Sequence, residues 1–133
     1  MDKFSQAKRS EIMSKIGSKN TKPEKLIFAE LKQIHYRKQY PIPGKPDIAF
    51  PKLKIAVFIN GEFWHGRNLN KYRDGLSDFW INKIEGNVAR DRKNYRELRK
   101  KGWSIITLWD KNIYENPSKE AQKIIKLKNL KEL

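Results

Sequence analysis

The stretch from Ile55 to Ile59 limits the fold more than any other part of the chain, because its five residues are all apolar. A run this short, rich in β-branched side chains, is typical of a buried strand and too short for a helix. Residues 46–50 predict a strand just before it, and the Lys-Leu-Lys segment 52–54 would turn the chain between the two. The sequence therefore predicts a β-hairpin that contains a buried strand.

Two chemically active side chains flank this hairpin. Asp47 stands near the start of the first strand, and His65 follows the second strand after Gly61 and an aromatic pair. A carboxylate in this position can bind Mg²⁺ through one oxygen, whereas an imidazole can accept a proton from water near neutral pH. A turn role for Asp47 and a structural role for His65 remain the alternatives.

The charge balance points to a polyanionic partner. The chain has 133 residues, with 30 Lys and Arg against 15 Asp and Glu and a net charge of +15. Such an excess favours nucleic acid over an anionic membrane, since no apolar run approaches the length of a membrane span. No cysteine and no signal-peptide pattern occur, so we expect a cytoplasmic protein that forms one domain over residues 1–133. A basic domain that is merely soluble is the plainer alternative.

The spacing of apolar and turn residues predicts the remaining elements. Residues 1–20 are polar and basic and predict a DNA-contacting arm or a loosely attached helix. Thr21-Lys-Pro-Glu24 is a capping-box pattern, which predicts a helix of about four turns and gives Glu24 a structural role. Gly102 predicts the end of a long helix that starts at Asp78. Further predictions are a strand at 36–40, a long functional loop at 66–78, a strand at 103–109 and a helix at 117–133. This order predicts an α/β domain.

The long helix carries a high density of cations, namely Arg90, Arg92, Lys93, Arg96, Arg99, Lys100 and Lys101. So many positive charges favour contacts with DNA phosphates over a simply solvated face. Asp91 lies among them, and we expect it to form a structural ion pair. Phe63 and Trp64 precede the candidate histidine, and they either pack in the core or wedge between base pairs.

Several short sequence blocks are weak signals singly but specific in their joint order and spacing. They are Arg9-Ser-x-x-Met13 with Ile16, Glu24-Lys25, Pro-Gly-Lys-Pro-Asp47, Val57-Phe-x-x-Gly-x-Phe-Trp-His65, Phe79-Trp-x-x-Lys-Ile84, Asn87-Val-x-Arg-Asp91-Arg, Gly102-Trp103 and Leu108-Trp109. In these blocks the sequence resembles the very-short-patch-repair (Vsr) mismatch endonucleases, and the likeness covers nearly the whole chain.

The resemblance implies a restriction-endonuclease-like fold, with a central mixed β-sheet flanked by helices. It also implies an enzyme that uses Mg²⁺ to nick one DNA strand beside a T:G mismatch, in DNA repair and alongside other repair proteins. Asp47 matches the family's metal-binding aspartate, and His65 matches its catalytic histidine. Glu24 matches a carboxylate near the metal-bound water network, and the backbone carbonyl of Ile59 would face the metal.

The resemblance implies further residues that touch DNA or orient the site. Met13, Phe63 and Trp64 match side chains that wedge into the DNA beside the mismatch. Asn87 and Asp91 lie in a matching block and would orient the catalytic residues.

The chain departs from the family at the structural zinc site and near the catalytic histidine. The four zinc-binding positions of the family hold Glu62, Arg67, Leu69 and Lys111 here, so no zinc is expected. We expect a charge pair of Glu62 with Arg67 or Lys111 in its place. Asn60 replaces a second histidine, and it can hydrogen-bond phosphate or water but cannot carry a proton near neutral pH.

Three alternatives to a mismatch nickase remain open at this stage. A nuclease of the same fold, of restriction or homing type, would act on unmismatched DNA. A non-catalytic DNA-binding module would keep the scaffold without cleavage, and a basic RNA-associated protein would need no divalent metal. A cleavage assay with mismatched and fully paired duplexes in Mg²⁺ separates these alternatives.

Overall fold

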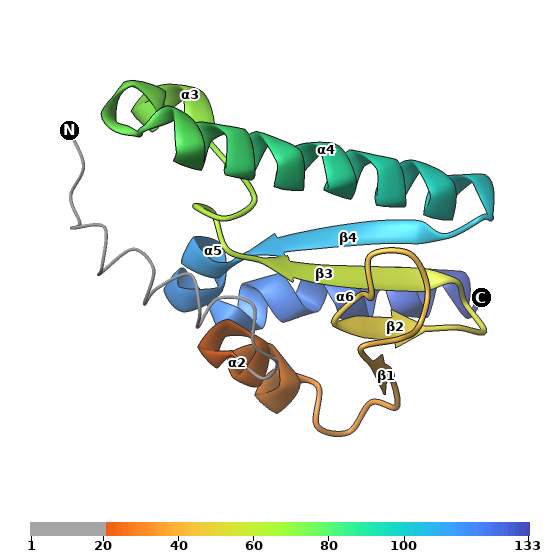
Figure 1. Ribbon diagram of the computed structural model, residues 1–133. Coiled ribbons are helices and arrows are strands. Elements are labelled where there is room, and N and C mark those ends of the chain that lie inside the picture. Colours follow the sequence, from red (N-terminus) through yellow and green to blue (C-terminus); the bar gives the residue numbers. More distant parts are fainter. Residues whose placement is uncertain (1–20) are drawn as a thin grey trace.

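A four-stranded mixed sheet forms the centre of the computed structural model, which describes residues 21–133 (Figure 1). Its strands are β1 (Arg37–Lys38), β2 (Ile48–Phe50), β3 (Ile55–Asn60) and β4 (Ser104–Trp109). They lie in the order β1-β2-β3-β4. The pairs β1–β2 and β2–β3 are antiparallel, whereas β3 and β4 are parallel. The expected mixed sheet is therefore confirmed.

The hairpin expected from the sequence consists of β2 and β3, in which Ile48 lies opposite Val57. All residues of β3 except Ile59 are buried, as is typical of a strand covered on both faces. The ladder ends at Ile48, two residues later than the predicted start of the first strand. Beyond this pair, the side chain of Asp47 accepts the amide hydrogen of Ile59, so a carboxylate takes the place of a strand backbone group.

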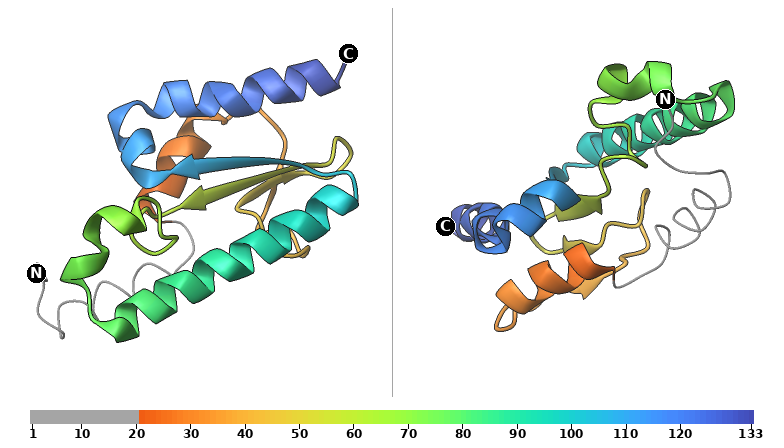
Figure 2. Two further views of the ribbon diagram at one scale, coloured as in Figure 1. Left: turned by 90° about the horizontal axis from the view of Figure 1, so that it is seen from above. Right: turned by 90° about the vertical axis from the view of Figure 1, so that its left-hand side faces the viewer.

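Helices cover both faces of the sheet (Figure 1, Figure 2). They are α2 (Lys22–Glu30), α4 (Asp78–Lys100), α5 (Asp110–Glu115) and α6 (Pro117–Lys131). On one face, Ile27 of α2, Ile113 of α5 and Ile124 of α6 are fully buried in the larger core cluster. On the other face lies α4, part of the crossover between the parallel strands β3 and β4, and its Leu98 joins Phe58 in a smaller cluster.

The long basic helix begins and ends where the sequence predicts. α4 starts at Asp78 and ends at Lys100. Gly102 has φ +88°, a left-handed conformation that glycine adopts without a steric penalty at the end of a helix. The expected elements at 103–109 and 117–133 are confirmed as β4 and α6.

The first described helix differs from its prediction in length and capping. α2 ends at Glu30, after which the amide of Ile34 bonds back to the carbonyl of Leu31 in a tighter turn. Thr21 is the N-cap residue, but its side chain makes no capping hydrogen bond. The Thr21 side-chain contact of the capping box is therefore wrong, and Glu24 is buried, with 6% of its surface exposed.

Three other segments differ from the prediction or add to it. β1 has only two residues, and the loop 66–78 contains α3 (Leu69–Tyr72) and the 3₁₀ helix η1 (Arg73–Gly75). The short α5 follows β4 directly and was not expected. The predictions for residues 1–20, Met13 among them, lie outside the described residues. Within residues 21–133, no helix is both long enough and apolar enough to cross a membrane.

Candidate active site

A cavity of about 230 Å³ lies at the end of β3, between the hairpin and α4. It gathers side chains that are far apart in the sequence, from α2 through the hairpin to α4. Of the predicted site residues, its lining includes Glu24, Asp47, Ile59, Asn60, Trp64, His65, Asn87 and Arg90, together with Asp91. The predicted residues Phe63, Arg92, Lys93 and Arg96 do not line it.

Two hydrogen bonds hold the Asp47 carboxylate in this cavity. The backbone N–H of Ile59 donates to one carboxylate oxygen at 2.6 Å, and the side-chain amide of Gln39 donates to the other at 3.2 Å. In an extended strand, the N–H and C=O of one residue point to the same side. The carbonyl of Ile59 therefore faces the side of Asp47, beyond the last β2–β3 pair.

The surroundings of Asp47 disfavour its negative charge. Burial raises the pKa of Asp47 to about 6, and the hydrogen bond from Ile59 lowers it only in part. The charge of Glu24 and a hydrogen bond with the Glu24 carboxyl group raise it further, while Gln39 lowers it. Two carboxyl groups thus share one buried space, and the charge of Glu24 makes ionisation of Asp47 less favourable.

This pair of acidic groups fits a hard divalent cation. Mg²⁺ prefers oxygen ligands and is usually held by one or two carboxylates, with water and phosphate oxygens completing its shell. Asp47, Glu24 and the carbonyl of Ile59 offer such oxygens. Within residues 21–133, no three His, Asp or Glu side chains gather into a complete metal cage, so part of the shell would have to come from water or substrate.

His65 is held by a carboxylate from the opposite element. Its Nδ1 atom lies 2.6 Å from Oδ2 of Asp91 on α4. A carboxylate can only accept hydrogen bonds, so Nδ1 carries the hydrogen in this pair and Nε2 of the neutral ring is left as the acceptor. The partner of Asp91 is therefore the candidate catalytic base, and with a neutral ring the contact is a hydrogen bond and not the expected ion pair.

A second contact from α4 fixes the turn that carries His65. The side-chain amide of Asn87 donates to the carbonyl of Trp64 at 3.1 Å. Asn87 and Asp91 are four residues apart, so they lie on one face of α4 and hold neighbouring residues of the same turn. The backbone N–H of His65 also donates to the carbonyl of Gly61 at 3.0 Å. The orienting role expected for this block of α4 agrees with these contacts.

Asn60 lines the cavity but makes its side-chain contact inside the protein. Only 5% of its surface is exposed, and its amide donates to the hydroxyl of Tyr95 at 3.2 Å. Burial raises the pKa of Tyr95, so its hydroxyl stays protonated near neutral pH. The side-chain amide of Asn60 is therefore already engaged with Tyr95. The DNA contact of Asn60 remains a prediction.

Sequence reasoning missed three residues of this site. Gln39 binds Asp47, Lys45 lines the cavity, and Tyr95 supports Asn60. Lys45 lies within the Pro-Gly-Lys-Pro-Asp block, so its position next to the aspartate was an available signal. No local pattern marks Gln39 or Tyr95, since their roles depend on contacts across the sheet.

The two aromatic residues before His65 occupy different places. Phe63 stacks on Tyr72 of α3, with 6.1 Å between ring centroids. Trp64 lines the cavity, and the ammonium group of Lys83 lies 5.7 Å from its ring centroid. Both rings are partly exposed. Their insertion between base pairs remains a prediction.

Comparison with known proteins identifies the family. Residues 1–71 match the family described as DNA mismatch endonuclease Vsr. The chain is 44% identical over 136 residues to the type II nicking enzyme V.HpaIIP of Haemophilus parainfluenzae, covering 94% of this chain and 96% of that protein. It is 32% identical over 114 residues to DNA mismatch endonuclease Vsr of Escherichia coli strain K12, covering 82% and 73%. This chain belongs to the Vsr family of DNA endonucleases.

The type II nicking enzyme V.NmeAIP of Neisseria meningitidis serogroup A is similar to this Vsr-family chain at 46% identity over 114 residues. That alignment covers 82% of this chain and 81% of the relative. Family membership makes DNA the partner of this endonuclease, and it accounts for the excess of positive charge.

In this Vsr-family chain, an ion pair joins Glu62 and Arg67, two of the four positions where the resemblance implies a zinc site in the family. A guanidinium nitrogen of Arg67 lies 2.8 Å from a Glu62 carboxylate oxygen and 3.1 Å from the side-chain oxygen of Asn112. The same guanidinium lies 5.1 Å from the ring centroid of Trp109. The expected charge pair is confirmed with Arg67, and among the described residues Lys111 does not form it. Arg67 thus ties the turn after β3 to α5.

The cations of α4 separate into two groups. Arg90 lines the candidate cavity and donates to the side-chain oxygen of Asn87 at 3.4 Å. Arg92 and Arg96 line a different groove, and Lys93 is exposed without lining either space. Only one of the predicted phosphate-binding cations of this helix therefore lies at the candidate active site.

Proposed function

We propose that this Vsr-family endonuclease nicks one strand of duplex DNA beside a T:G mismatch and depends on Mg²⁺. The observation that carries the proposal is the convergence of two pairs on one cavity. Asp47 with Ile59 offers metal ligands, and His65 with Asp91 offers an oriented base. These four residues come from separate elements, so their meeting is a property of the fold.

The acidic side of the cavity would hold the metal. Asp47 and the carbonyl of Ile59 would be its protein ligands, and Glu24 would complete the negative surroundings. Mg²⁺ bound there supplies Lewis-acid polarisation of the scissile phosphate and charge stabilisation of the leaving oxygen. Gln39 and the N–H of Ile59 keep the Asp47 carboxylate in one orientation.

The proton transfer would fall to His65. Its Nε2 atom would accept a proton from the attacking water, while Asp91 holds the Nδ1 hydrogen and stabilises the charged ring. Asn87 keeps the preceding turn in place through the carbonyl of Trp64. Arg90 and Lys45 bring positive charge to the cavity lining, where a phosphate group would lie.

A strand-resolved cleavage assay tests the proposal. The protein is incubated with Mg²⁺ and two end-labelled duplexes that differ only by one T:G pair. We expect one nick beside the mismatch and no cut in the paired duplex. Asp47→Asn should abolish cleavage and keep DNA binding, whereas the exposed Asp74→Asn should behave as wild type. Undiminished cleavage in excess EDTA would contradict the metal requirement.

Nicking of fully paired DNA is the second candidate. The burial of Asn60 against Tyr95 favours it, because the family has a second histidine at this position and this chain lacks that proton carrier. Equal cleavage of the two duplexes would assign this activity. Binding without cleavage of either duplex in Mg²⁺ would indicate a non-catalytic module.

A further inference from the structure

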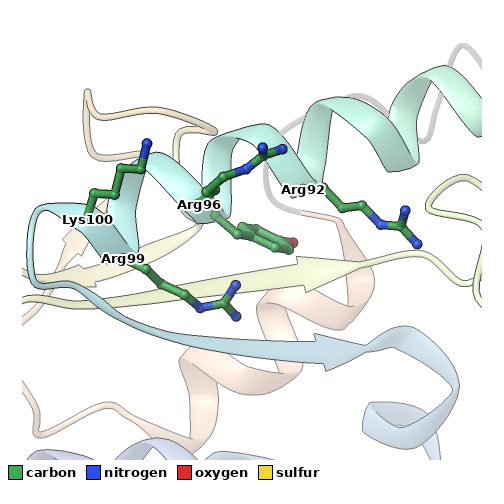
Figure 3. Close-up of a pocket in the computed structure, with 5 residues that line it drawn as sticks. Arg92, Arg96, Arg99 and Lys100 are labelled. Atoms are coloured by element: carbon green, nitrogen blue, oxygen red, sulfur yellow. The ribbon is translucent and has the colours of Figure 1, made fainter.

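A second basic groove lies on α4, separate from the catalytic cavity. Its volume is about 570 Å³, and its lining consists of Arg92, Tyr95, Arg96, Arg99 and Lys100. Figure 3 shows the side chains of Arg92, Arg96, Arg99 and Lys100 extending from α4. None of the five lines the cavity that contains Asp47 and His65.

Helix geometry places the groove and the cavity on different sides of α4. Successive residues are rotated by about 100° around a helix axis. Relative to Asp91, which faces His65, Arg90 and Arg92 therefore point to opposite flanks. Arg92, Arg96 and Arg99 are spaced by four and three residues, so they share the second flank. The helix itself separates this flank from Arg90 and the catalytic cavity.

The cations of this groove have no acidic partners among residues 21–133. Arg92, Arg96 and Lys100 are exposed and form no ion pair there, and Arg99 lies 6.0 Å from the ring centroid of Tyr95. Glu97 is the only acidic residue in this half of the helix besides Asp91, and its position on the helix places it on the other flank. Four like charges repel each other in the free protein, and a polyanion would relieve that repulsion.

The floor of the groove is rigid. The Tyr95 ring packs at 4.9 Å between centroids against Phe58 of β3, and its hydroxyl accepts from the Asn60 amide. This partly buried, hydrogen-bonded ring gives Arg99 a packed surface to lie on. The cations are therefore arranged over a firm base and not on a mobile tail.

We propose that this groove binds the phosphate backbone of duplex DNA that flanks the cleavage position. Arginine suits this role because its planar guanidinium can bind phosphate oxygens in pairs. From Arg92 to Lys100 the helix rises by about 12 Å, comparable to the axial rise of about three or four nucleotides of one strand. Arg92 directly follows Asp91, so one end of the groove lies next to the candidate cavity on the adjoining side of α4. This proposal extends the proposed function to flanking DNA, and it rests on that function for the position of the duplex.

Charge removal from the groove tests this inference against charge removal elsewhere. The groove variant is Arg92→Gln, Arg96→Gln and Arg99→Gln. The control variant is Lys111→Gln, Lys119→Gln and Lys126→Gln, which removes the same charge from exposed positions on α5 and α6. DNA affinity is measured over a range of salt concentrations with a long and a short duplex, and single-turnover cleavage is measured at saturating DNA.

We expect the groove variant to bind the long duplex at least about tenfold more weakly, and the slope of log K against log salt to fall by roughly 2 to 3, at about 0.9 per lost phosphate contact. The control should keep a slope close to wild type, and the cleavage rate at saturating DNA should be unchanged in both. The difference should vanish on a short duplex that lacks the flank. Equal weakening in both variants, or the same loss at every duplex length, would overturn the assignment. Weaker binding by the groove variant with no cleavage by wild type would support the groove and refute the proposed function.

Discussion

The buried Asp47 makes one quantitative prediction that needs no catalytic assay. In the metal-free protein its carboxyl group titrates near pH 6, compared with 3.8 for an unperturbed aspartate. The folded state therefore binds a proton more tightly than the unfolded state. The sign follows directly: the contribution of Asp47 to the free energy of unfolding is largest at low pH and is lost as the pH rises from about 4 to above 6.

The size of this loss follows from the pKa difference. At about 1.4 kcal/mol for each pH unit between the two values, the ionised Asp47 costs the folded, metal-free protein about 3 kcal/mol. Asp47→Asn keeps an oxygen that can accept from the Ile59 amide but cannot ionise. Relative to the variant, wild type should therefore lose about 2.5 kcal/mol of stability between pH 4 and pH 8.

Urea unfolding followed by tryptophan fluorescence measures this difference. Wild type and Asp47→Asn are compared at several pH values in EDTA, with the exposed Asp74→Asn as the control that should show no such divergence. Added Mg²⁺ should then stabilise wild type more at pH 8 than at pH 5, and the Asp47→Asn variant little at either. A stability difference that stays constant with pH, or that changes in favour of wild type, would refute the buried-carboxylate argument.

Three further predictions follow from single contacts. His65→Gln should lower single-turnover cleavage by roughly 10²- to 10⁴-fold, whereas the exposed His35→Gln, the only other histidine position, should leave the rate unchanged; equal rates would remove His65 from the mechanism. Gly66→Ala should be destabilising by more than about 1 kcal/mol, because φ is +70° and a Cβ would lie 2.7 Å from a Val88 methyl group. Gly86→Ala, with open space around it, should be stabilising by roughly 0.5–1 kcal/mol, and chemical denaturation compares the two. Arg67→Ala should lower the unfolding free energy by about 1–2 kcal/mol through loss of its charged hydrogen bonds, a cost that a zinc chelator would not reproduce in wild type; an unchanged midpoint would contradict a structural role.

The sequence determined those features that depend on neighbours along the chain. The apolar run 55–59 and the turn before it specify the hairpin, and the hairpin register places Asp47 beside Ile59. The end of α4 likewise rests on a local signal, the backbone freedom of Gly102 just after the helix. The excess of positive charge predicted a polyanionic partner. Net charge depends only on composition, so this prediction did not require the fold.

Only the tertiary structure decided which distant side chains meet. Glu24 fits a capping box as a local pattern, yet packing of α2 on the sheet buries it beside Asp47. Asp91 could have paired with any nearby cation, and the crossing of α4 over the end of β3 gives it His65. The same crossing assigns the cations of α4 to two separate surfaces. A helix pattern fixes which residues share a face, but the direction of that face depends on packing between elements.

The proposed hydrolysis requires that the Asp47 carboxylate and the ring nitrogen of His65 act on the same phosphate. A variant that lacks both the Asp47 carboxylate and the His65 ring but still cuts DNA at the normal rate would refute this requirement. Local sequence patterns cannot determine whether Asp47 and His65 meet. Only the packing of elements that are far apart along the chain brings the two side chains together.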